Sequence, residues 1–173
     1  MQSALQASSA PAPTSQAAQT LSATRPLVTL SLGGAAFALP LEQVLRSVRA
    51  VTITPLPQAP EIICGIVNLQ GGILPVVNLR QRLGMVEHEL ALSDQLLIAQ
   101  SATRRLAIIV DAVNGVADYP LQDFIAIDTV VGGTRYVSGV VKAPDGMMLI
   151  HDLDRLLSLE EEAGLEAALF PAH

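Results

Sequence analysis

The residues that could do chemistry are concentrated in one short segment near the end of the chain. His151, Asp152 and Asp154 fall within the sequence HDLD, and a histidine with two carboxylates could bind a metal ion or transfer protons. A structural role competes with this interpretation, because Asp152 would cap a short helix and Asp154 would lie in its first turn, where a carboxylate favours the helix dipole. A metal-binding or small-ligand site, hydrolytic or not, using His151 and Asp154 therefore stays open as an alternative.

The rest of the sequence lacks the motifs of common catalytic and cofactor sites. It contains no glycine-rich nucleotide loop, no G-x-S-x-G and no H-E-x-x-H. The other histidines, His88 and His173, have no partner at ligand spacing. The single cysteine, Cys64, excludes an internal disulfide and fits a reducing compartment. The sequence thus predicts neither an enzyme nor a bound metal or cofactor.

The composition predicts a folded chain that does not bind nucleic acid. Half of the 173 residues are hydrophobic and 15% are charged, which suits one domain, or two very small ones that share a core. Aromatic residues make up only 3%, so the core must be aliphatic and stacking surfaces for bases are scarce. The net charge of −6 disfavours contact with phosphate backbones.

The N-terminal residues and a second long uncharged run bear on where the protein is located in the cell. Residues 1–24 contain no charged side chain and lack the basic start and apolar stretch of a secretory signal, so we predict a disordered arm. The run from Ile62 to Leu79 is long enough to span a membrane, but Asn, Gln, Gly and Pro interrupt it. We therefore expect a cytoplasmic protein with no direct membrane insertion.

Alternating apolar residues predict strands around this run. In GIVNLQGGILPVVNLRQRLG, residues 65–84, we expect strands at 65–69 and 73–77 joined by a glycine-containing turn. A helix capped by Asn78 and stopped by Gly84 would follow.

The flanking residues complete the predicted elements. A Gly-Gly pair predicts a hairpin over residues 27–40, and apolar residues at helical spacing predict a short helix over 41–48. Further strands are expected at 51–55, 95–100 and 105–111. Asn114-Gly115 is typical of a tight turn, and we expect it to end a short helical piece.

An internal repeat supports this division of the chain. With a shift of 74 positions (139 − 65 = 74), GIVNLQGGILPVVNLRQRL aligns without a gap with GVVKAPDGMMLIHDLDRLL. A weaker match relates FALPLEQV to LAIIVDAV at a shift of 69 (106 − 37 = 69). The chain therefore contains two versions of one unit, which predicts two small β-barrels that pack together and fold cooperatively.

The repeated segments, EIICGIVNLQGGILPVVNLRQRLG and YVSGVVKAPDGMMLIHDLDRLL, resemble the chemotaxis coupling protein family, the CheW-like domains. The resemblance covers about residues 27–158. It implies an all-β fold of two small five-stranded SH3-like β-barrels packed together, with short helices. We expect this domain at residues 25–158, followed by an acidic C-terminal tail at 159–173 that forms a solvated helix or, alternatively, a docking peptide for a partner.

The resemblance also implies a function without catalysis. Members of the family are adaptors that couple chemoreceptor tips, those of methyl-accepting chemotaxis proteins, to a CheA-type histidine kinase in chemotaxis or related motility and pilus pathways. Sheet edges bind the kinase and a groove between the barrels holds the receptor helix. On this basis we expect partner contact at Val44, Arg46, Val67, Asn68, Leu69, Gln70, Gly71, Val113 and Gly139. The family commonly has arginine at Gln70 and often has glutamate near Arg46, so these two positions indicate a rearranged contact.

Overall fold

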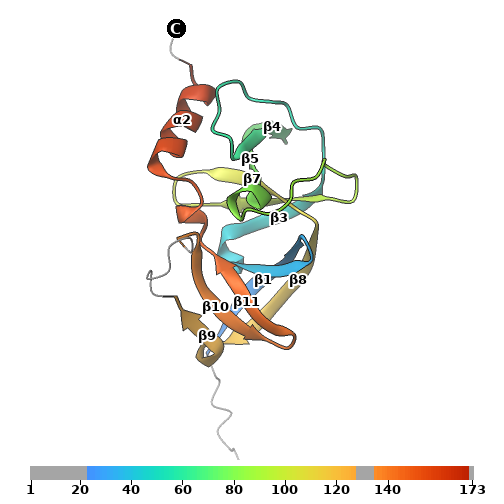
Figure 1. Cartoon of the computed structure of the whole chain (residues 1–173), viewed down its shortest axis with the longest axis vertical. Helices are drawn as coiled ribbons and strands as arrows, with labels where there is room; N and C mark the ends of the chain where they lie inside the picture. The colour runs from blue at the N-terminus through green and yellow to red at the C-terminus, as the bar shows by residue number, and fades with distance from the viewer. Residues whose placement is uncertain (1–22, 128–134, 172–173) are drawn as a thin grey trace, which may run out of the picture.

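The computed structural model describes residues 23–127 and 135–171, which form two β-sheets and a few short helices (Figure 1). Sheet A has six strands in the order β8-β1-β2-β11-β10-β9, and sheet B has five in the order β3-β6-β7-β5-β4. The strands of sheet A are β1 (Thr24–Leu32), β2 (Ala35–Pro40), β8 (Ala112–Pro120), β9 (Phe124–Ala126), β10 (Val137–Ala143) and β11 (Gly146–His151). Those of sheet B are β3 (Val44–Arg49), β4 (Ile63–Leu69), β5 (Gly72–Val77), β6 (Gln95–Gln100) and β7 (Arg105–Val110). The predicted all-β class is confirmed.

The helical segments are short, and none of those described is both long and apolar enough to cross a membrane. They are η1 (Leu41–Gln43), α1 (Leu79–Arg82), η2 (Leu121–Asp123), η3 (Leu153–Arg155) and α2 (Leu159–Leu169). The predicted caps are confirmed: the Asn78 side chain accepts a hydrogen bond from the Gln81 amide, and Asp152 accepts one from the Asp154 amide.

The two sequence units exchange hairpins. Sheet A combines the hairpin β1–β2 of the first unit with β8 to β11 of the second, whereas sheet B combines the hairpin β6–β7 of the second with β3 to β5 of the first. A parallel pair joins the pieces in each sheet, with Ala38 opposite Ile150 and Ala107 opposite Val76. These pairs reproduce both sequence shifts (150 − 76 = 74; 107 − 38 = 69).

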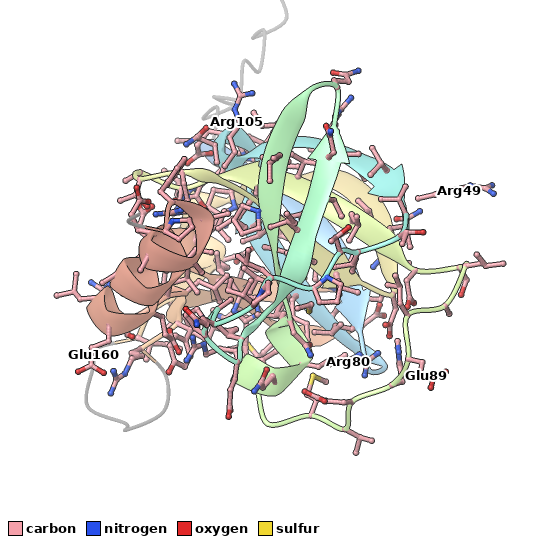
Figure 2. All side chains as sticks on the ribbon, turned by 90° about the horizontal axis from the view of Figure 1, so that it is seen from above. Arg49, Arg80, Glu89, Arg105 and Glu160 are labelled. Carbon is pink, nitrogen blue, oxygen red and sulfur yellow. The ribbon has the colours of Figure 1, made fainter. Side chains whose placement is uncertain are left out.

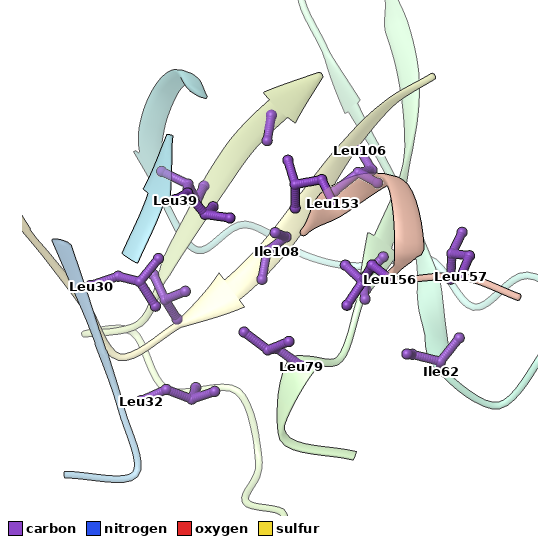
Figure 3. Packing of buried hydrophobic residues seen from close by; sticks show 14 of the residues in the cluster. Leu30, Leu32, Leu39, Ile62, Leu79, Leu106, Ile108, Leu153, Leu156 and Leu157 are labelled. Atoms are coloured by element: carbon purple, nitrogen blue, oxygen red, sulfur yellow. The ribbon is translucent and has the colours of Figure 1, made fainter. Parts of the chain in front are cut away.

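Each sheet curls around its own apolar cluster, and a third cluster lies between the sheets. The cluster inside sheet A contains Leu27, Ala38, Val141, Met148 and Ile150, and that inside sheet B contains Val67, Val76, Leu96, Ile98 and Ala107. The third and largest cluster draws leucines from both units, among them Leu30, Leu39, Leu79, Leu106 and Leu153 (Figure 3). Because this cluster is shared, each barrel would expose part of its apolar surface without the other.

Three local predictions are wrong. Residues 41–48 form only the single turn η1 before strand β3, because Leu41 and Leu45 are exposed and do not share a buried face with Val44. Residues 51–55 contribute one isolated bridge, from Thr54 to Ile66, instead of a strand. Asn114-Gly115 lies inside β8, at a bulge where the pairing register with β1 shifts.

The predicted C-terminal helix is present as α2, but one side of it packs on its own chain, so it is not surrounded by solvent on all sides. A capping box between Ser158 and Glu161 starts the helix. Leu165 is fully buried in the cluster between the sheets. Gly164 interrupts the helix pattern but lets the ring of Pro60 approach, since a Cβ there would stand 3.2 Å from its Cγ.

Candidate functional site

The hairpin β4–β5 ends in a two-residue turn that presents a polar side chain. Gln70 and Gly71 have φ angles of 53° and 80°, the left-handed pair that a tight hairpin turn requires, between the paired residues Leu69 and Gly72. Glutamine at a positive φ is uncommon, whereas glycine tolerates it. Both turn residues are exposed.

Strand β3 approaches this hairpin through a bulge. Its register with β6 shifts between Val44 and Arg46, so Leu45 is an extra residue with 47% of its surface exposed. The bulge in β8 is its counterpart in the second unit, because 44 + 69 = 113 and the register of β8 shifts next to Val113. Val44 and Val113 both lie half-buried against the cluster between the sheets.

A hollow of about 300 Å³ lies where these elements meet, at the open end of sheet B. It is lined by Leu45, Arg46, Leu69, Gln70, Gly72, Leu74, Ile98 and Arg105. Figure 2 shows Arg105 at the end of the molecule where the tip of the β4–β5 hairpin lies, and Arg80 on the opposite side. The hollow therefore has an apolar floor and a polar rim with two guanidinium groups.

The structure brings only some of the predicted partner-binding residues together. Arg46, Leu69 and Gln70 line the hollow. Val67 lies below it, 3% exposed, in the cluster inside sheet B. Asn68 and Gly71 are exposed on the hairpin but do not line the hollow, and Val44, Val113 and Gly139 lie elsewhere.

Gly139 sits in sheet A at a position that explains its lack of a side chain. A Cβ there would stand 2.9 Å from the carbonyl oxygen of Ile125 on the neighbouring strand β9. The residue is buried, so its own atoms offer little to a partner.

The residues of the hollow that sequence reasoning missed are Leu45, Gly72, Leu74, Ile98 and Arg105. Arg104 and Arg105 form an adjacent basic pair, in which Arg105 begins β7 and Arg104 immediately precedes it. Arg104 forms ion pairs with Glu162 and Glu166 of α2. Among the described residues, the side-chain hydrogen bond of Arg105 is the one of 3.3 Å to the Gln100 side chain. The alternation of β7 was the available signal, because Arg105 shares a face with Ala107 of the cluster inside sheet B.

His151 and Asp154 do not form a common site. His151 is 2% exposed and its ring packs on Phe37, with the ring centroids 4.9 Å apart. Burial lowers the pKa of His151 to about 4, so the ring is neutral in the folded protein at pH 7. Asp154 is exposed and accepts a 2.7 Å hydrogen bond from the Ala102 amide. This arrangement gives the two residues structural roles.

A second group of titratable side chains lies between the two sheets, around Asp111. Its carboxylate accepts hydrogen bonds from Arg80 and from the Gly33 amide, and His88 Nε2 is 3.5 Å away. Burial alone would raise the pKa of Asp111, but the hydrogen bonds and charge of Arg80 outweigh it and lower the pKa. A metal ion could be held by the ligand atoms of His88, Asp94 and Asp111, which lie within 4.8 Å of one another. Arg80, however, already pairs with the Asp111 oxygen that faces His88. The group is best described as an ion-pair network that links the sheets.

The remaining reactive side chain, Cys64, is not poised for nucleophilic chemistry. It lines a pocket of about 430 Å³ together with Ile53, Arg80, His88 and Ile109. Burial raises the pKa of the Cys64 thiol to about 11, so the thiolate is scarce at neutral pH. The described residues thus place no activated nucleophile beside a base.

The chain is similar to known proteins over most of its length. The family model described as "CheW-like domain" matches residues 26–161. The chain is 29% identical over 140 residues to the chemotaxis protein CheW of Rhizobium meliloti, a match that covers 79% of this chain and 90% of that protein. It is 28% identical over 126 residues to protein FrzA of Myxococcus xanthus, covering 71% and 78% respectively.

The fold is also similar to a solved structure. The crystal structure of the scaffolding protein TtCheW from Thermoanaerobacter tengcongensis matches with a TM-score of 0.74 and 29% sequence identity. The match covers 80% of this chain and 96% of that chain, so it includes both sheets.

Proposed function

Because the chain belongs to the family of CheW-like domains, we propose that it is a non-catalytic adaptor that couples chemoreceptors to a CheA-type histidine kinase. The observation that carries this proposal is the similarity to a scaffolding protein across 96% of that protein's chain. The site supports it, because the described residues form a hollow with an apolar floor and a polar rim, and they place no nucleophile beside a base. An adaptor needs complementary surfaces and no reacting group.

The kinase would bind at the hollow and the adjacent edges of sheet B. β3 and β4 are the two end strands of this sheet, and the only bridge on the outer side of β4 among the described residues is that from Thr54 to Ile66. Free strand edges favour pairing with a strand of another protein. The neighbouring rim residues Arg46 and Gln70 would then determine the specificity for that partner.

The receptor would bind at the junction between the sheets. Val44 and Val113 occupy equivalent bulges there and are half-buried, so each keeps apolar surface available. Partly exposed apolar side chains of this kind suit contact with one face of the helical, cytoplasmic tip of a methyl-accepting chemotaxis protein. The protein would act in the cytoplasm, recruited to membrane-associated receptor arrays by these contacts. The similarity to the chemotaxis protein CheW supports a role in chemotaxis, and the proposal extends to related motility and pilus pathways.

Reconstitution tests the proposal directly. The purified chain, a CheA-type kinase of the same bacterium and receptor-containing membranes would be mixed, and kinase autophosphorylation would be measured. We expect stimulation only when all three components are present, together with sedimentation of the chain with the receptor membranes. No binding to any kinase or receptor of that bacterium would refute the adaptor function.

A further inference from the structure

Only some of the arginines of this acidic chain form ion pairs within the part that the structure describes. Within residues 23–127 and 135–171, the arginines that form ion pairs with carboxylates of the same chain are Arg25, Arg80, Arg82, Arg104 and Arg155. The arginines without such a partner in these ranges are Arg46, Arg49, Arg105 and Arg135. Two of the four, Arg46 and Arg105, line the hollow at the open end of sheet B.

Strand alternation directs both of these side chains toward the inside of the barrel. Arg105 precedes Ala107 by two positions in β7, and Arg46 precedes Val48 by two positions in β3. Ala107 and Val48 belong to or pack against the cluster inside sheet B. Side chains two positions apart in a strand share a face. Both guanidinium groups therefore project over the apolar floor formed by Leu69, Leu74 and Ile98.

An unpaired guanidinium at the rim of an apolar hollow favours one kind of occupant. A carboxylate would accept hydrogen bonds from the N–H groups along the edge of the Arg46 or Arg105 guanidinium, while an adjacent apolar side chain would cover the floor. The β3 edge disfavours pairing with the same edge of a second copy, because Arg46 and Arg49 of both copies would be brought together. The occupant that fits is therefore an acidic segment of a different protein.

We infer that Arg46 and Arg105 select the kinase by a carboxylate-bearing segment with an apolar side chain at its tip, which makes Arg105 a specificity-determining residue. The inference rests on the proposed function, since it assigns the chemistry of the partner at that same surface. It also accounts for the neutral residue Gln70 in the hairpin turn, because the positive charges of the hollow come from Arg46 in β3 and Arg105 in β7.

The test measures the affinity of the full chain for a CheA-type kinase that binds the wild type. Arg105→Gln and Arg46→Gln should each weaken binding by about fivefold, and Arg105→Glu by more than about tenfold. Raising NaCl from about 0.05 M to about 0.5 M should weaken the wild type and affect the Arg46→Gln/Arg105→Gln double variant less. Lys142→Gln removes one positive charge from an exposed position of β10 in sheet A, outside the hollow, and should change affinity by less than about twofold.

The outcomes separate this inference from the proposed function. If the wild type binds the kinase but the rim variants bind equally well at every salt concentration, the inference is overturned and the adaptor function stands. If the wild type binds no kinase, the proposed function fails and this inference fails with it. If sedimentation velocity shows that Arg105→Gln instead abolishes self-association of the chain, the occupant is a second copy and the inference is overturned. Circular dichroism melts confirm that each variant is folded.

Discussion

Gly65 and Gly139 occupy the same position in the two barrels, 74 residues apart (139 − 65 = 74). Each stands where its hairpin shifts register, and each is approached by a backbone carbonyl, that of Thr54 for Gly65 and that of Ile125 for Gly139. These two glycines therefore let a neighbouring segment cross close to the hairpin in each unit.

The crossing predicts a graded cost for alanine at these glycines. Gly65 also has a φ of 154°, so Gly65→Ala would add backbone strain to the collision and should lower the free energy of unfolding by about 3 kcal/mol. Gly139→Ala should cost about 1 to 2 kcal/mol. Gly72→Ala is the control, because nothing lies closer than 3.5 Å and a change of about 0.5 kcal/mol or less is expected. Urea denaturation measures all three; equal costs would contradict the assigned role.

Alternation along β4 predicts opposite effects at adjacent residues. Val67→Asp would bury an unpaired carboxylate in the cluster inside sheet B and should cost at least about 3 kcal/mol, enough to unfold or aggregate the protein. Asn68→Asp, on the exposed face, should change stability by less than about 0.5 kcal/mol. Thermal melts measure the stability of both variants. A folded Val67→Asp protein would show that the assignment of buried and exposed faces of β4 is wrong.

The turn residue Gln70 should affect binding without affecting folding. Gln70→Arg adds a charge at the exposed rim of the hollow, so stability should stay within about 0.5 kcal/mol while affinity for the kinase or receptor changes measurably. Gln122→Arg makes the same change at an exposed position of η2, outside the hollow, and should leave both unaltered. Titration by calorimetry provides the affinities; unchanged binding to every partner would remove the turn from the interface.

The helix α2 offers two leucines in contrasting environments. Leu165→Ala would leave a cavity in the cluster between the sheets and should cost about 2 to 4 kcal/mol. Leu159 is 90% exposed at the start of the same helix, so Leu159→Ala should be neutral within about 0.5 kcal/mol. Similar melting temperatures for the two variants would mean that α2 is not docked in solution.

The buried imidazole of His151 predicts a dependence of stability on acid. Its pKa is about 4 in the folded protein and near 6.5 in the unfolded chain, so the unfolded state binds more protons between these values. Stability from this group is complete above pH 6.5 and falls by up to about 1.4 kcal/mol per unit as the pH drops toward 4. His151→Phe should flatten the curve of unfolding free energy against pH over that window, and an unchanged slope would show that another group is responsible.

Local features of the fold could be predicted from the sequence because neighbouring residues determine them. Glycine at the hairpin turns, Asn78 and Asp152 at the caps and the alternation in β4 each act within a few positions. Strand β3 could not be recognised, since its apolar residues fit a helix equally well and only pairing with β6 selects the extended form.

Long-range features lay beyond the local pattern. The hairpins β1–β2 and β6–β7 are both antiparallel pairs of largely buried apolar strands, so nothing local in either one specifies which sheet it joins. The docking of α2 depends on Arg82 and Arg104, which are remote in sequence from Glu161 and Glu162. Arg105 likewise joins the hollow only because β7 lies beside β5 and β6.

The exchange of hairpins between the sheets also bears on ancestry. A single unit, ending after α1, holds a hairpin and a set of strands that belong to different barrels, so it cannot close a barrel by itself. A half-length ancestor would have been a homodimer in which each subunit lent its first hairpin to the other. Gene duplication and fusion would have turned that twofold axis into the present pseudo-symmetry, and freed the two ends to diverge toward different partners.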